Sequence, residues 1–131
     1  MQAHADYIAQ PQSVASQAAL FSTMGINDLQ KAAKAGQAGA QFYLGTHYQY
    51  GKDVAKDDKQ AFAWFKAAAD QGLSPAQLNV GRMYADGIGV KKDFKTAITL
   101  YTKVAKQNES KLLALLAKER INDLKKQLKN S

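Results

Sequence analysis

Hydrophobic residues recur along positions 37–108 at the spacing of amphipathic helices. From Ala40 to Tyr50 apolar side chains return at helical spacing with no proline among them, which predicts a helix. A second helix is predicted after Asp57, an aspartate that can cap free backbone N–H groups before the next apolar period. Gly51 and Gly72 follow the two apolar periods and are typical helix stops. The pattern therefore predicts two helices joined by a short turn.

The same pattern returns 36 residues further along the chain. When residues 37–72 are aligned with residues 73–108, 12 of the 36 positions are identical. The identical pairs include Ala40/Ala76, Gln41/Gln77, Gly45/Gly81, Tyr48/Tyr84, Gly51/Gly87, Asp57/Asp93, Ala61/Ala97 and Gln71/Gln107. A fixed period of this length indicates stacked helix pairs. We therefore expect an all-α fold, an α/α solenoid of two tandem helix-pair repeats.

Two positions in the repeat carry expectations about packing. Gly45 lies inside a predicted helix, where glycine costs about 1 kcal/mol relative to alanine. Its recurrence as Gly81 predicts that a second helix approaches closely there. Asp53 stands where the second copy has Gly89, at a positive-φ position. Because aspartate tolerates left-handed geometry better than most residues, we expect both copies to keep the turn.

Helices are also predicted on both sides of the repeats. Residues 13–36 hold a helix up to Met24 and a shorter one that ends at Gly36, and we expect them to form a partial N-terminal cap. A long helix from about Ser110 is expected to resemble the first helix of a third unit, with its second helix missing, and to cap the array. Its apolar stripe comprises Leu112, Leu113, Leu116, Ala117, Ile121, Leu124 and Leu128, with Leu112 in the place of Ala76 and Leu116 in that of Val80.

The predicted organisation has three parts. Residues 1–12 form a flexible arm, and residues 13–108 form the solenoid, with full repeats at about 37–72 and 73–108. Residues 109–131 form a basic C-terminal capping helix.

The two copies resemble the Sel-one-like repeat family, a relative of the tetratricopeptide repeat. The family pattern is Ala-Gln-x-x-Leu-Gly-x-x-Tyr-x-x-Gly-x-Gly-Val-x-x-Asp-x-x-x-Ala-x-x-Trp-Phe/Tyr-x-x-Ala-Ala-x-x-Gly. The first copy reads AQFYLGTHYQYGKDVAKDDKQAFAWFKAAADQG and departs at Asp53. The second reads AQLNVGRMYADGIGVKKDFKTAITLYTKVAKQN and departs at Val80, Leu100, Val104 and Asn108. The resemblance implies an adaptor that binds other proteins and has no shared active site.

Composition narrows the chemistry. The 131 residues suffice for one domain with a modest core, and 46% apolar with 22% charged residues is ordinary globular composition. The absence of cysteine excludes disulfides, thiolate zinc sites and a thiol nucleophile. No run of residues is long and apolar enough to predict a transmembrane segment.

Few residues qualify for catalysis. His47 is replaced by Met83 in the second copy, so we interpret this position as structural. Asp57 and Asp58 are adjacent, and neighbouring side chains on a helix point about 100° apart, which suits an acid–base pair poorly. Capping explains Asp57 better. We expect no enzyme activity, no metal site and no cofactor.

The basic excess lies near the C-terminus. Residues 103–131 carry eight basic and three acidic side chains, a net charge of +5. Binding of nucleic acid is one interpretation. The stretch holds no aromatic residue for base stacking and is interrupted by Glu119 and Asp123, so we expect no specific nucleic acid. A solvated helix face and attraction of an acidic protein partner are the other interpretations. A monomer and a weak homodimer through this helix both stay open.

The N-terminal residues bear on localisation. Ala3-His4-Ala5 has the small-x-small form of a signal-peptidase site. We expect a periplasmic protein on this basis. Chance occurrence in an alanine-rich stretch is the alternative, and it leaves a cytoplasmic location open.

In arrays of this kind the first helices of successive units line the concave face. The positions expected to face a partner there are Phe42, Thr46, Gln49, Tyr50, Leu78, Arg82 and Asp86. Inter-repeat core is an equal alternative for Phe42 and Leu78, whereas exposed Tyr50 and Arg82 are typical interface anchors. The aromatic residues expected in the core are Trp64, Phe65, Tyr84 and Tyr101.

These observations predict a non-catalytic module that binds another protein. Family analogy suggests a bacterial immunity protein that neutralises a secreted toxic effector, for example one delivered by a type VI secretion system. An adaptor or regulator in envelope assembly or signalling is the alternative. A cell-wall or β-lactam-acting hydrolase is a more distant one.

Overall fold

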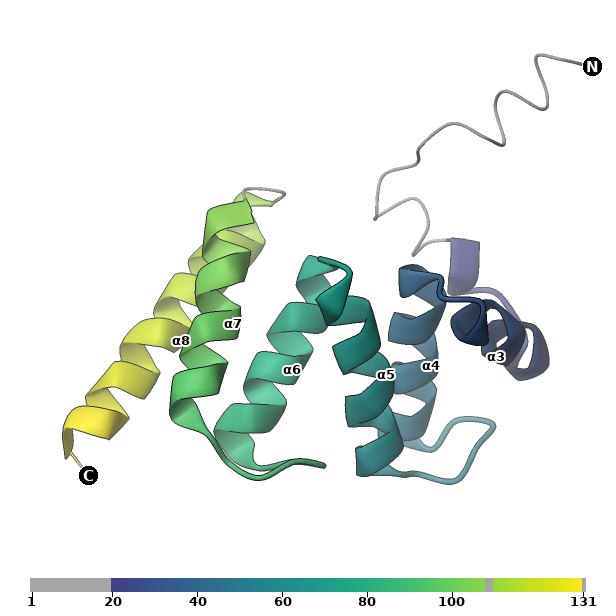
Figure 1. Cartoon of the computed structure of the whole chain (residues 1–131), viewed down its shortest axis with the longest axis horizontal. Coiled ribbons are helices and arrows are strands. Elements are labelled where there is room, and N and C mark those ends of the chain that lie inside the picture. Colours follow the sequence, from purple (N-terminus) through teal and green to yellow (C-terminus); the bar gives the residue numbers. More distant parts are fainter. Residues whose placement is uncertain (1–19, 108–109, 131) are drawn as a thin grey trace, which may run out of the picture.

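The computed structural model describes residues 20–107 and 110–130. Six helices lie wholly within these residues, which contain no strand. They are α3 (Ile26–Lys34), α4 (Ala38–Tyr50), α5 (Asp58–Asp70), α6 (Ser74–Asp86), α7 (Phe94–Gln107) and α8 (Lys111–Asn130). Figure 1 shows them as a row in chain order with α3 and α8 at its two ends. The expected all-α solenoid is confirmed, with α4–α5 and α6–α7 as its two helix pairs.

Some predictions fall outside the described residues. The arm over residues 1–12, the Ala3-His4-Ala5 motif and most of the helix expected over residues 13–24 lie there. Of that last helix, Phe21 is described, and it is buried in one cluster with Leu29 and Leu44. The residues just before α3 therefore contribute to the core of the first unit.

The turn after the first helix of each unit has the same backbone in both copies. Gly51 and Gly87 end α4 and α6 in the left-handed conformation, with φ of 69° and 70°. Two residues later, Asp53 has φ of 62° and Gly89 has φ of 70°. The expectation that aspartate would keep the left-handed turn is confirmed.

Aromatic residues of the second helices pack directly on glycines of the first. Phe65 and Tyr101 hold equivalent positions, and both are buried. Phe65 lies against Gly45, and Tyr101 lies against Gly81. The close helix approach expected from the recurring glycine is confirmed, and it brings α4 onto α5 and α6 onto α7.

Repeated glutamines tie each unit to the preceding one. Gln41 Nε2 donates to the Ala33 carbonyl at 3.2 Å, and Gln77 Nε2 donates to the Ala69 carbonyl at 3.2 Å. Both glutamines are buried. At the ends of α5 and α7 the corresponding bonds are Gln71 Nε2 to the Gly36 carbonyl, 2.8 Å, and Gln107 Nε2 to the Gly72 carbonyl, 3.2 Å. The glutamine identities between copies therefore reflect polar links across the stack.

Helix α8 begins where the sequence places it but presents a different face to α7. Ser110 Oγ accepts a hydrogen bond from the Leu113 N–H at 3.3 Å and caps the helix. The residues that pack against the α7 core are Leu113, Ala117, Ile121 and Leu124.

The predicted register of Leu112 and Leu116 is wrong. Instead of taking the buried positions of Ala76 and Val80, these leucines are 66% and 40% exposed. Helix α6 lies between α5 and α7 and buries two faces, whereas α8 packs mainly on α7 within the described array. With one principal neighbour, α8 needs one apolar face and turns the other toward solvent.

Candidate partner-binding groove

A groove of about 470 Å³ lies across the first helices of the units. Helices α4, α6 and α8 supply most of its lining, and α7 contributes one residue. Of the seven residues predicted to face a partner, six line this groove: Phe42, Thr46, Gln49, Tyr50, Leu78 and Arg82. Asp86 is exposed at the end of α6 and is not among the lining residues. The structure therefore brings six of the seven together and leaves Asp86 outside.

Phe42 and Leu78 belong both to the core and to the groove. The Phe42 ring lies 5.6 Å from the Phe65 ring and 5.2 Å from the Tyr43 ring, measured between centroids. Leu78 packs against the cluster that contains Tyr101. Both side chains are partly buried and also line the groove. The two interpretations that the sequence left open for these residues are therefore compatible.

Sequence reasoning missed five lining residues: Tyr43, Asn79, Tyr101, Leu116 and Arg120. Tyr43 and Asn79 hold equivalent repeat positions next to the predicted Phe42 and Leu78, so helical spacing had the information to include them. Tyr101 was expected in the core, where it is 1% exposed, and it also borders the groove. No sequence signal marked Leu116 and Arg120, since their place depends on the rotation of α8.

The aromatic residues expected in the core lie there to different degrees. Phe65 and Tyr101 are buried. Trp64 and Tyr84 are partly buried and pack against the core clusters. Tyr50, by contrast, is 73% exposed at the C-terminal end of α4. Of these aromatic residues, the buried Tyr101 and the exposed Tyr50 line the groove.

The charged residues that line the groove are basic, and within the described part of the chain they have no acidic partner. The ion pairs among the described residues join His47 with Asp53, Lys56 with Asp58 and Lys66 with Asp70. Neither Arg82 nor Arg120 takes part in one.

The charges of Arg82 and Arg120 affect the pKa of Tyr101. Burial raises the pKa of its phenol, while Arg120 and Arg82 act to lower it and Asp86 acts to raise it. The hydroxyl is therefore neutral near pH 7.

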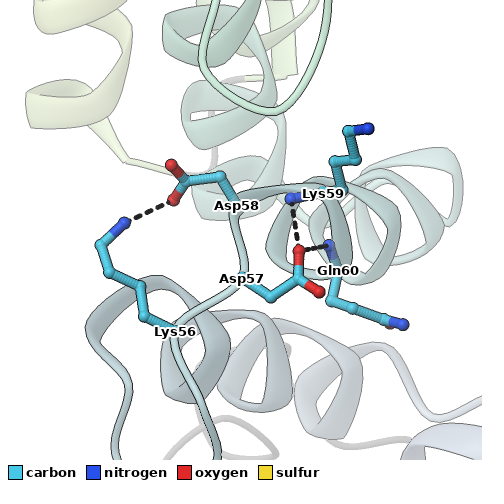
Figure 2. Close-up of polar contacts among 5 residues, drawn as sticks. All are labelled: Lys56, Asp57, Asp58, Lys59 and Gln60. Atoms are coloured by element: carbon cyan, nitrogen blue, oxygen red, sulfur yellow. Dashed lines mark hydrogen bonds and ion pairs between the residues drawn. The ribbon is translucent and has the colours of Figure 1, made fainter.

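The candidate catalytic residues Asp57, Asp58 and His47 make contacts that stabilise the local structure. Asp57 Oδ1 accepts hydrogen bonds from the N–H groups of Lys59 and Gln60, at 3.0 Å and 3.2 Å, which confirms its role as the cap of α5. Asp58 pairs with Lys56 Nζ at 2.8 Å. In Figure 2 the two carboxylates point away from each other.

His47 is partly buried, and its Nδ1 lies 2.9 Å from the Lys52 carbonyl oxygen. Over residues 20–107 and 110–130 no group of three or more acidic or histidine side chains could hold a metal ion. In that same part of the chain, no helix is long and apolar enough to cross a membrane.

Stacked helix pairs with a groove across their first helices define the chain as a helical-repeat protein. The family model of the Sel1 repeat matches twice in tandem, at residues 38–73 and 74–109, which together cover more than half of the chain. The protein belongs to the Sel1 repeat family.

Solved structures agree with this assignment. The chain is 41% identical to a Sel1 repeat protein from Oxalobacter formigenes, with a TM-score of 0.65, and the match covers 72% of this chain and 68% of that one. It is 33% identical to c5321, a protective antigen present in uropathogenic Escherichia coli strains that displays an SLR fold, with a TM-score of 0.71. That match covers 88% of this chain but only 26% of c5321. No match is found among curated proteins.

Proposed function

We propose that this protein binds another protein and holds a segment of it in the groove across α4, α6 and α8. The convergence of Phe42, Tyr50 and Arg82 from two repeat units in one groove carries the proposal. Tyrosine and arginine are the side chains that most often dominate interface energies. Sel1 repeats generally act as protein-interaction modules, which supports the same conclusion.

The size of the groove suits a short segment. Its volume of about 470 Å³ lies within the range of roughly 300–1,000 Å³ typical of small-molecule pockets, so it has room for a few side chains of a partner and not for a folded domain. The exposed ring of Tyr50 offers a large contact area with few rotatable bonds to restrict. A partner segment that covers Tyr50 and Arg82 would bury both side chains.

Affinity capture from lysate of the native cells tests the proposal. The parent chain is used beside Tyr50→Ala, Arg82→Ala and a control, Lys59→Ala, which alters an exposed residue of α5 outside the groove. We expect the parent chain and Lys59→Ala to retain one protein that the two groove variants, Tyr50→Ala and Arg82→Ala, do not retain. The thermal unfolding midpoints of the two groove variants should equal that of the parent chain, which shows that the variants are folded. Retention of that protein by all four chains would refute the proposal.

We further propose that the bound protein is a secreted toxic effector and that this chain is its immunity protein. The support is analogy with small exported proteins that carry these repeats, together with the Ala3-His4-Ala5 motif, which favours the periplasm. Production of the captured protein in the periplasm should then kill cells unless this chain is co-produced, and Tyr50→Ala and Arg82→Ala should lose protection. A captured envelope or signalling protein without toxicity would instead favour the adaptor alternative.

A further inference from the structure

Two arginines from different helices line the same groove. Arg82 comes from α6 and Arg120 from α8. Among the described residues no carboxylate lies within ion-pair distance of either guanidinium. Arg82 is partly buried and Arg120 is exposed. A carboxylate supplied by the partner would pair with these charges.

Tyr101 lies beside the two charges in the groove lining. It borders the groove, but with 1% of its surface exposed it offers little contact area to a partner. Arg120 and Arg82 both act to lower the pKa of its phenol, in keeping with the place of all three side chains in the groove lining. Asp86 also acts on the phenol, but it is exposed and outside the groove lining. The two charged side chains that line the groove, Arg82 and Arg120, are therefore both positive.

Apolar surface lies next to these two arginines. Phe42 and Leu78 line the groove from α4 and α6, and Leu116, 40% exposed, lines it from α8. Residues 103–131 carry a net charge of +5, which attracts acidic partners over longer distances. The combination fits carboxylate side chains that alternate with an apolar side chain.

We propose that the groove recognises an acidic segment within the partner protein. Its Asp or Glu carboxylates accept hydrogen bonds from Arg82 and Arg120, and an adjacent apolar side chain packs on Phe42 and Leu78. Guanidinium–carboxylate contacts of this kind are directional and charge-assisted. This inference rests on the proposed function, because it specifies which segment the groove holds.

Selection from short random peptides displayed on phage tests the inference without knowledge of the partner. Because the displayed peptides have no free C-terminal carboxylate, any acidic preference must come from Asp or Glu side chains. We expect the parent chain to enrich peptides that contain Asp or Glu next to an apolar residue. The double variant Arg82→Gln/Arg120→Gln should lose the acidic enrichment. The double variant Lys118→Gln/Lys125→Gln removes the same charge from exposed positions of α8 outside the groove and should keep it.

Direct binding of one selected peptide to the purified chain gives the second measurement. We expect Arg82→Gln and Arg120→Gln each to weaken binding about tenfold, since a hydrogen bond to a charged group is lost. Equal enrichment of neutral peptides, or an acidic preference that survives the arginine double variant, would overturn the inference. In that case a loss of peptide binding with Tyr50→Ala would still support the groove as the binding site. Failure of the parent chain to select any peptide would overturn both proposals.

Discussion

The ring of Phe65 occupies the space next to Gly45 that a side chain on that glycine would need. A β-carbon at Gly45 would lie 2.9 Å from Phe65 Cδ1. The second unit repeats the relationship, because a β-carbon at Gly81 would lie 2.8 Å from Tyr101 Cε1. Contacts this short force a neighbour to move, and both rings are buried.

Gly45→Ala is therefore expected to destabilise the protein even though alanine favours helices. Alanine gains about 1 kcal/mol over glycine in helix propensity. Overpacking against a buried ring typically costs about 1–3 kcal/mol, including the cost of displacing Phe65, and we expect this cost to be the larger of the two. Urea unfolding measures the difference. The control compares Gly45→Ala/Phe65→Leu with Phe65→Leu, since the smaller leucine leaves room for a β-carbon at position 45. A more stable Gly45→Ala protein would show that the helices separate at little cost.

The equivalent positions 53 and 89 should respond differently to substitution. A β-carbon on Gly89 would overlap the backbone carbonyl of Asp58 in the preceding unit, and its φ of 70° is unfavourable for a side chain. Gly89→Ala is expected to cost about 2 kcal/mol or more. Asp53→Gly, at an exposed side chain with φ of 62°, should change stability by less than about 1 kcal/mol. Thermal unfolding of both variants checks this, and equal losses would contradict it.

The equivalent buried glutamines Gln41 and Gln77 should contribute differently to the free energy of unfolding. Gln41 Oε1 accepts from Gln71 Nε2 at 2.9 Å, whereas no described residue donates to the buried Gln77 Oε1. Each amide nitrogen makes the same bond to the preceding unit. Gln41→Met is expected to cost about 1–2 kcal/mol. Gln77→Met should cost clearly less, because it also removes an unpaired acceptor.

Urea unfolding of the two methionine variants, at matched protein concentration and pH, gives this comparison. A larger loss for Gln77→Met than for Gln41→Met would mean that the Gln71 contact adds nothing to the stack.

Asp93 is expected to make stability depend on acidic pH. Hydrogen bonds from the hydroxyl and the N–H of Thr96, at 2.7 Å and 3.1 Å, hold the pKa of this exposed carboxyl below its usual value. Its contribution is therefore complete above the unfolded pKa, near pH 4, and is lost as pH falls through the lower folded pKa. Unfolding midpoints between about pH 6 and about pH 2 should fall less steeply for Asp93→Asn, which keeps a capping side chain. Parallel curves for the two proteins would refute the assignment.

Much of the groove was predictable because the repeat has known geometry. Once residues 37–108 were assigned to two helix pairs, the spacing on the first helices placed Phe42, Thr46 and Leu78 on one side. Asp86 was included by the same spacing, yet it lies at the last residue of α6, beyond the groove. Spacing along one helix does not show where a groove between helices ends.

The sequence by itself determined the helix pairs, their ends and their close contacts. Gly51, Asp57 and Gly45 act through the local backbone or through one repeated neighbour, so their roles follow from their positions in the repeat. Only the tertiary structure decided how α8 is rotated, because several leucines of that helix offered more than one apolar face. Packing on α7 selected one face, and it thereby exposed Leu116 and brought Arg120 to the groove beside Arg82.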